Sequence, residues 1–208
     1  MALELHLSTT TAYHTILIAK SSKDSASHHE PTPMYHICSP HRAAFNFKTT
    51  KIARIDRSVA HDAAYHFTSK KSEDIKECTE YGSGVVEMAR INWGTLATPP
   101  QVILEGQILS LKTTGIMKSD TVFEGPDGLT YTWFLGLHTT LSVEKDGKKI
   151  EVAKYHEPFS FTKHPYLTVQ PEAMHILDLV VTTWLLVTMR KQNNATAAAT
   201  TAAVVATV

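Results

Sequence analysis

Groups that could bind a metal ion gather in one short stretch of the sequence. The segment HHEPTPMYHICSPH places five of them within fourteen residues: His28, His29, His36, Cys38 and His41. Imidazole and thiolate are common zinc ligands, usually supplied as two pairs that close a loop. The spacing here fits no zinc module, and three prolines interrupt the segment. We therefore interpret it as a surface loop, with a metal site as the alternative, and we assign no metal ligand.

His175 and Asp178 offer an imidazole and a carboxylate three residues apart. On a helix this spacing places both on one face. A catalytic acid is one interpretation. The favoured interpretation is a structural role, because a buried carboxylate needs hydrogen-bond partners. We expect Asp178 to accept such hydrogen bonds at the open end of a barrel.

Ser83, in YGSGVV, superficially resembles a nucleophile elbow. It lacks the full G-x-S-x-G frame and the strand-turn-helix context. The sequence also contains no P-loop, dinucleotide-binding fingerprint or paired metal carboxylates. We expect no catalytic residue and no cofactor, and hence a protein that is not an enzyme.

Three lysines, Lys145, Lys148 and Lys149, surround Asp146-Gly147, with Lys154 further along. Near an anionic membrane, each basic side chain contributes about 1 kcal/mol. The three are therefore candidates for contact with lipid headgroups. The alternative is a solvated hairpin whose lysines oppose edge-to-edge aggregation.

Composition restricts the class of partner. The chain has 208 residues, 43% of them hydrophobic, which is enough for one substantial core. Twenty basic residues balance twenty acidic ones, so nucleic acid is not expected as a partner. Two cysteines, Cys38 and Cys78, and the absence of a basic leader favour a reducing, cytoplasmic setting. A single disulfide is the alternative.

Most of the chain predicts short β-strands separated by polar turns. Asp146-Gly147 between alternating arms is typical of a type I′ hairpin, and Pro126-Asp127-Gly128 is a turn signal. Many short strands with regular turns indicate an antiparallel sandwich or barrel. Loop insertions are expected at about 21–33 and 58–84.

Residues 171–191 predict one apolar helix. Pro171 and Glu172 suit its first turn, and Arg190 and Lys191 its last. Because apolar residues occupy nearly every face, we expect it to be buried all round, at the centre of a barrel. The expected core helix includes Leu177, Asp178, Leu179, Val181, Trp184 and Leu185. A final β-strand is the alternative, since residues 180–183 are β-branched.

The apolar run within this segment is too short for a predicted membrane span. It extends from Ile176 to Met189, which is fourteen residues including Asp178, whereas a span needs roughly 20 apolar residues. We therefore expect no transmembrane helix. Residues 193–208 form an Ala/Thr-rich tail that we expect to be disordered, with a weak tail anchor as the alternative.

Several of these segments, in order, resemble a family of short fungal proteins, the domain-of-unknown-function 6593 type. They are KTTKIARI, VEMARINW, FEGPDGLTYTWFLG, VAKYHE and ILDLVVTTWLLV. The most specific are PDG-x-x-Y-x-W (Pro126 to Trp133) and LD-x-x-V-x-T (Leu177 to Thr183). The likeness covers roughly Leu3 to Lys191. In layout the chain is similar to the tubby C-terminal, LURP-one and phospholipid-scramblase group, a β-barrel around a hydrophobic C-terminal helix.

The resemblance implies a mainly β protein, with an antiparallel barrel enclosing that helix in a single domain of residues 1–192. By analogy of fold alone it also implies a lipid-related role. The expected function is therefore non-enzymatic binding of a lipid, phosphoinositide-like, or of a protein partner. The alternative is a hydrolase or metal-dependent enzyme that uses the loop histidines.

Overall fold

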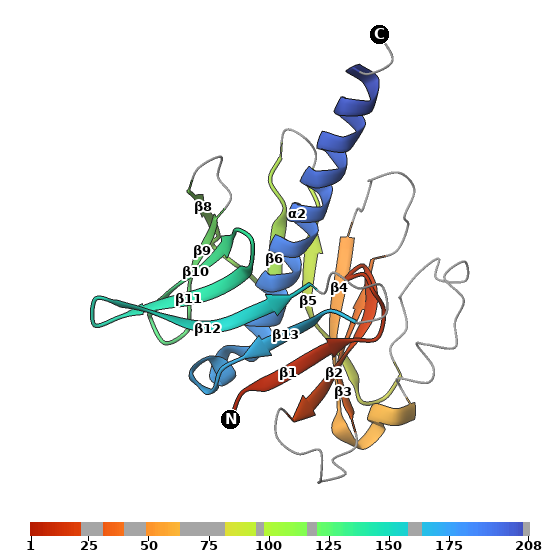
Figure 1. Cartoon of the computed structure of the whole chain (residues 1–208). Helices are drawn as coiled ribbons and strands as arrows, with labels where there is room; N and C mark the ends of the chain where they lie inside the picture. The colour runs from red at the N-terminus through yellow and green to blue at the C-terminus, as the bar shows by residue number, and fades with distance from the viewer. Residues whose placement is uncertain are drawn as a thin grey trace.

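The computed structural model describes residues 1–21, 31–39, 49–62, 82–94, 98–115, 120–157 and 164–205. Side chains are described for all of these except Ser21 and residues 193–205. In this part of the chain, thirteen strands form one antiparallel sheet. The sheet curls around a long C-terminal helix (Figure 1).

The strands and helices occur along the chain in the following order. The first six strands are β1 (Leu3–Leu7), β2 (His14–Ser21), β3 (Thr32–Cys38), β4 (Thr49–Ile55), β5 (Val85–Asn92) and β6 (Gln101–Leu104). The other seven are β7 (Gln107–Ile108), β8 (Lys112–Thr114), β9 (Asp120–Glu124), β10 (Thr130–Leu135), β11 (Thr139–Lys145), β12 (Lys148–His156) and β13 (Tyr166–Val169). Short 3-10 helices η1 (Arg57–Val59) and η3 (Pro171–Ile176) follow β4 and β13, and η3 leads into helix α2 (Leu177–Val205).

The predicted type I′ hairpin is confirmed between β11 and β12. Asp146 and Gly147 have φ angles of 52° and 70°, and Lys145 lies directly opposite Lys148. Positive φ at both central residues matches the twist of the flanking strands. Glu105 and Gly106, between β6 and β7, have the same geometry, with φ angles of 49° and 80°.

The order of strands across the sheet is β7-β6-β5-β4-β3-β2-β1-β13-β12-β11-β10-β9-β8. Strand β13 joins the two halves because Leu167 is opposite both Leu5 of β1 and Tyr155 of β12. The sequence did not predict β13. Its four residues precede Pro171 and carry no turn signal, so only pairing with two distant strands defines it.

The two edge strands, β7 and β8, are consecutive in the chain and only residues 109–111 connect them. The sheet therefore curls around α2 and returns to its starting edge, where the backbone bridges the gap. No ladder joins β7 to β8 in the described residues. The predicted mainly β fold with a C-terminal apolar helix is confirmed, but hydrogen bonds do not close the sheet into a barrel. We call this open edge the seam.

Helix α2 is the centre of the core. Its enclosed turns contain seven apolar side chains with no exposed surface: Val180, Val181, Trp184, Leu185, Leu186, Val187 and Met189. Leu179 is also buried, whereas Leu177 and Asp178 are half-buried. A helix that is apolar on every face needs cover on every face, which the curled sheet provides.

Thr182 and Thr183 fit inside this apolar environment because their hydroxyls are hydrogen-bonded. Thr182 and Thr183 each donate to the carbonyl four residues earlier at 2.7 Å, a bond that β-hydroxyl residues form within helices. The Trp133 indole N–H donates to Thr183 Oγ1 at 2.9 Å. The alternative of a final β-strand for residues 176–189 is therefore wrong.

The structure places three boundaries differently from the sequence. The helical segment starts as 3-10 helix η3, and α2 continues to Val205 in place of the expected disordered tail. Alanine has the highest helix propensity, and extending an existing helix is cheap compared with nucleating one. The expected loop 21–33 overlaps β3, which starts at Thr32, and residues 22–30 and 63–81 of the two expected loops lie outside the described residues.

One segment in the described part, Pro171–Gln192, is long and apolar enough to cross a membrane by length and composition. Most of it, 72% of its most apolar window, is buried inside the fold. The sheet thus already covers the surface that a bilayer would cover.

Candidate functional site

Two clefts open at the end of the sheet where η3 leads into α2. Their volumes are about 630 Å³ and 790 Å³. They share three wall residues, Met34 of β3, Ile55 of β4 and Met174 of η3. We call the first the basic cleft and the second the acidic cleft, after the charged residues that line each.

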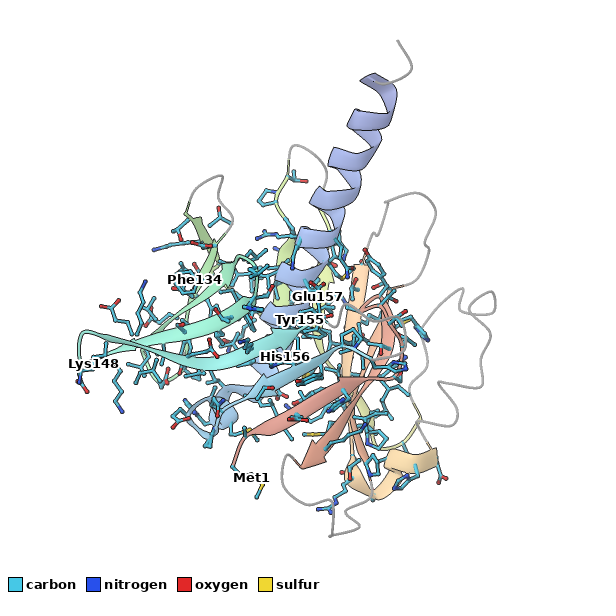
Figure 2. The ribbon with its side chains drawn as sticks, viewed as in Figure 1. Met1, Phe134, Lys148, Tyr155, His156 and Glu157 are labelled. Carbon is cyan, nitrogen blue, oxygen red and sulfur yellow. The ribbon has the colours of Figure 1, made fainter. Side chains whose placement is uncertain are left out.

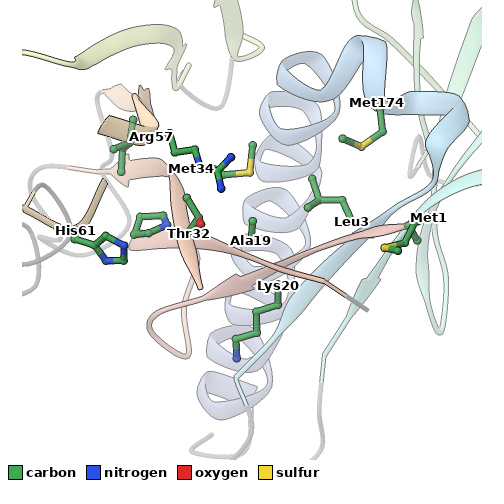
Figure 3. Close-up of a pocket in the computed structure, with 12 residues that line it drawn as sticks. Met1, Leu3, Ala19, Lys20, Thr32, Met34, Arg57, His61 and Met174 are labelled. Carbon is green, nitrogen blue, oxygen red and sulfur yellow. The ribbon is translucent and has the colours of Figure 1, made fainter. Parts of the chain in front are cut away.

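The basic residues that line the basic cleft are Lys20, Arg57 and His61, and its lining in the described part of the chain includes no carboxylate (Figure 3). Lys20 is the penultimate residue of β2 and Arg57 is the first of η1, and both are exposed. Neither makes an ion pair within the described residues. Nearby carboxylates are engaged elsewhere, because Glu4 contacts His6 at 3.0 Å and Asp56 accepts from the Ser58 N–H at 2.8 Å. Lys20 and Arg57 are therefore available to an external anion.

The rest of the basic cleft is largely apolar. Leu3, Ala19, Pro33, Met34, Ile55 and Met174 contribute to its wall. Figure 3 shows Arg57 and His61 on the η1 side, with Leu3 and Met1 opposite. Met174 remains 39% exposed, and unbranched methionine side chains adapt readily to a bound apolar group. The cleft therefore combines positive charge with apolar surface.

The acidic cleft lies at the seam, and Asp178 forms its central contact. Tyr35 OH donates to Asp178 Oδ1 at 2.7 Å, and Arg54 donates to Asp178 Oδ2. Arg54 also contacts Glu105 Oε1 at 3.4 Å. Burial raises the pKa of Tyr35 to about 12, against the opposing charge of Arg54, so its hydroxyl stays a donor. Asp178 ties the start of α2 to β3 and β4.

His175 makes a separate contact on the other side of this cleft. Its Nε2 lies 2.9 Å from Asp127 Oδ2, which also accepts from Tyr131 OH at 2.8 Å. Burial alone would raise the pKa of Asp127, but hydrogen bonds from Tyr131, His175 and the Leu129 N–H lower it overall. The contact fixes the β9–β10 turn against η3. His175 and Asp178 thus have different partners and are not brought together.

An aspartate–histidine pair beside a cleft can activate a nucleophile. The residues lining the acidic cleft include no serine, threonine or cysteine. The described residues that line this cleft thus place no aliphatic hydroxyl or thiol beside His175.

The lysines of the β11–β12 hairpin lie elsewhere. Lys148 is at the tip, which projects away from α2 (Figure 2). All three, Lys145, Lys148 and Lys149, are exposed, and the Lys149 ammonium is 4.9 Å from the centroid of the Phe134 ring. Glu144 lies opposite Lys149 on the neighbouring strand. Neither cleft reaches this hairpin.

The histidine-rich stretch is only partly described. His36 and Cys38 lie in β3 and are buried, with the His36 ring edge-on to His14 at 5.2 Å. His28, His29 and His41 lie outside the described residues. Cys38 is disulfide-bonded, so its sulfur is not a thiolate ligand. Among the residues with described positions, no three His, Cys, Asp or Glu side chains form a group that could hold a metal ion.

The state of Cys38 agrees with the alternative of a disulfide that the sequence left open. The chain's other cysteine, Cys78, lies outside the described residues. Ser83 lies in an exposed turn that leads into β5, not into a helix, so it is not a nucleophile elbow.

Sequence reasoning missed the basic cleft. Lys20 and Arg57 each lie at the end of a predicted strand, and His61 lies in a stretch interpreted as a solvated insertion. The only usable signal was that both cations follow apolar strands. Nothing local shows that β2 and η1 meet in the fold.

Comparison with known proteins gives the family but no characterised relative. No curated protein matches the chain, and no solved structure does. The profile of a family of unknown function, DUF6593, matches residues 19–193. This range contains β3 to β13 and the enclosed part of α2. The chain therefore belongs to the DUF6593 family.

Proposed function

We propose that this protein is a non-enzymatic binding module that holds an anionic amphipathic ligand of the lipid class in the basic cleft. The observation that carries the proposal is the pairing of Lys20 and Arg57, two cations without ion-pair partners in the described residues, with a wall that is mostly apolar. A phosphorylated lipid headgroup with its adjoining acyl chain has this combination of properties.

Size and chemistry support the same ligand class. A volume of about 630 Å³ lies within the range of small-molecule sites, roughly 300–1,000 Å³. The planar guanidinium of Arg57 can hold a phosphate through two parallel hydrogen bonds, and Lys20 adds a point charge. Each Å² of apolar ligand surface buried against the methionines contributes about 25 cal/mol.

The cleft is a better candidate than the β11–β12 hairpin. The hairpin lysines have Glu144 and Asp146 as close neighbours in sequence and register, and Lys149 is already placed over Phe134. They are expected to add nonspecific attraction to an anionic surface. Specific recognition is expected in the concave cleft.

Vesicle flotation tests this proposal. The chain is mixed with phosphatidylcholine vesicles, with or without 5 mol% phosphatidylinositol 4,5-bisphosphate, at low and physiological salt (about 0.02 and 0.15 M, spanning the change in Debye length). We expect binding only to the anionic vesicles. Lys20→Glu with Arg57→Glu should reduce it at least tenfold, whereas Lys148→Glu with Lys149→Glu should leave most of it.

Two further arms distinguish the sources of the ligand chemistry. Soluble inositol trisphosphate tests the headgroup alone, and dodecanoate tests the apolar anion alone. Weak binding of each and strong binding of the complete lipid would support the proposal. Absence of wild-type binding to every probe, or loss of binding only in the hairpin variant, would overturn it.

A further inference from the structure

We propose that the seam beside β7 and β9 is a strand-addition groove that takes an extended, basic peptide segment of a partner protein. This inference does not depend on ligand binding in the basic cleft. It rests on the free backbone groups of the two edges, the charge between them and the shape of the acidic cleft.

Ile108 supplies free backbone groups on one side. The turn-closing pair Leu104↔Gln107 is followed by Ile103↔Ile108, and then the Leu109 N–H donates to the Val102 carbonyl at 2.9 Å. Hydrogen-bonded and non-hydrogen-bonded pairs alternate in antiparallel ladders, so Ile108 is in a non-hydrogen-bonded position. Its N–H and C=O therefore point away from β6, at an edge where its side chain is 66% exposed.

Glu124 supplies the matching groups on the other side. The Gly125 N–H donates to the Leu129 carbonyl at 2.9 Å, so the next pair, Glu124↔Thr130, is non-hydrogen-bonded. The Glu124 N–H and C=O therefore point away from β10, toward the side that β8 covers further along. The β8 ladder stops at Lys112↔Val122, which leaves the Glu124 backbone without a strand partner in the described residues.

The side chains around these edges define the charge of the partner. The lining of the acidic cleft contains three carboxylates, those of Glu105, Glu124 and Asp178, and one guanidinium, that of Arg54. Arg54 contacts both Asp178 and Glu105, and Glu124 makes no ion pair in the described part of the chain. The cleft therefore has an excess of negative charge, which a basic segment would neutralise.

The cleft also offers apolar positions beside the acidic ones. Leu104, Leu109 and Leu177 line it along with the shared Met34 and Met174. In an added strand, backbone hydrogen bonds supply affinity, and alternate side chains enter pockets that supply specificity. The seam therefore fits a segment in which basic and apolar residues alternate.

Nothing in the described residues covers this edge. Native sheets protect such edges with short strands, charges or covering loops. Strands β7 and β8 are short, but the cleft of about 790 Å³, which Gln107 of β7, Glu124 of β9 and residues of η3 line, remains open. An unprotected edge beside a cleft of one charge is the arrangement expected of a peptide site.

The test uses an acetylated, amidated Val-Lys-Val-Lys-Val-Lys peptide carrying a fluorophore, with binding followed by fluorescence anisotropy. Two controls share its side-chain pattern or its backbone. One replaces lysine with glutamate, and the other carries N-methyl groups on alternate backbone nitrogens, on the valines in one peptide and on the lysines in a second. Alternate N–H groups of a strand point to opposite neighbours, so a peptide between the two edges uses both sets. We expect the glutamate peptide not to bind, and each N-methyl peptide to bind at least tenfold more weakly than the unmethylated peptide.

Variants locate the binding at the seam. Glu124→Lys should weaken the peptide at least tenfold, and Ile108→Pro, which removes an outward N–H that the β6 ladder does not use, should do the same. Glu172→Lys changes an exposed charge on η3 outside the cleft and should have no effect. Circular dichroism and thermal melts establish that each variant is folded, and Lys20→Glu with Arg57→Glu should leave peptide binding unchanged.

Three results would overturn the inference. Binding of the N-methyl peptides as tight as that of the unmethylated peptide would show attraction by charge alone. Unchanged binding in both Glu124→Lys and Ile108→Pro would place the peptide elsewhere. A concentration-dependent dimer that Ile108→Pro dissociates would show that a second copy of the chain occupies the seam.

Discussion

The two ends of the enclosed part of α2 differ in what surrounds them. At the N-terminal end, side chains of β3, β4 and the β9–β10 turn contact the start of α2 and η3, and both clefts open there. At the other end α2 leaves the sheet (Figure 1), where Lys191 contacts Glu157 at 2.8 Å and neither cleft reaches. We therefore expect the proposed recognition at the N-terminal end, with the enclosed turns as its scaffold.

The largest expected effect comes from the scaffold. Trp184 is fully buried, and its ring lies 5.2 Å from that of Tyr155. Trp184→Ala removes a large side chain from a site that the sheet surrounds on every side, so it should lower the free energy of unfolding by about 3–5 kcal/mol. Urea denaturation measures this. Leu137→Ala, at a side chain that is 86% exposed, is the control, and a loss below about 1 kcal/mol for Trp184→Ala would show that α2 is not enclosed.

A smaller effect is expected at the N-terminal end. Asp178→Ala leaves the buried Tyr35 hydroxyl without its acceptor, which should cost roughly 1–3 kcal/mol. Adding Tyr35→Phe to Asp178→Ala should restore part of the lost stability, because the double variant no longer has a buried hydroxyl without an acceptor. Urea denaturation of the two single variants and the double variant gives the coupling energy. Additive losses would contradict the hydrogen bond between the two side chains.

Two partly buried histidines, His14 and His156, make the stability of the fold depend on pH. Burial lowers the pKa of His14, and burial followed by the charge of Lys154 lowers that of His156. Below the unfolded value of 6.5, the unfolded chain binds protons that the folded chain does not, so stability falls as pH falls from 6.5 toward the folded pKa. We expect a lower melting temperature at pH 5 than at pH 7.5. His14→Gln should reduce this pH dependence, and an equal dependence in the variant would exclude His14 as a contributor.

The smallest effect is expected at the far end. The last turns of α2 extend beyond the sheet (Figure 1), so removing 193–208 should change the free energy of unfolding by no more than about 0.5 kcal/mol. The same truncation should leave vesicle flotation unchanged. A truncated chain that no longer floats would support the alternative of a tail anchor.

The strands with clear local signals could be predicted from the sequence. Alternating patterns located β1 to β5 and the β11–β12 hairpin, because a half-covered strand alternates whatever its neighbours are. Strand β13 and the three-residue β8 could not be predicted, since each is defined by distant partners. The apolar run from Ile176 to Met189 correctly indicated a buried helix, but the end of α2 lies in an Ala/Thr stretch that carries no stop signal.

The candidate site was predictable only in part. Asp178 could be identified as a structural tie because a carboxylate in an apolar helix requires partners. The partners themselves, Tyr35 and Arg54, are more than a hundred residues away in the chain. The basic cleft depends on the meeting of β2, β3, η1 and η3, so its cations were indistinguishable from ordinary surface charges in the sequence.

Methionine methyl resonances test most directly whether recognition occurs at the N-terminal end of α2. Met34 and Met174 line the clefts, whereas Met88 and Met189 are buried in the core. Titrating a methyl-¹³C-methionine sample with dioctanoyl phosphatidylinositol 4,5-bisphosphate should shift the Met34 and Met174 signals and leave those of Met88 and Met189 in place. A saturable shift of Met189 with Met34 and Met174 unchanged would contradict the account.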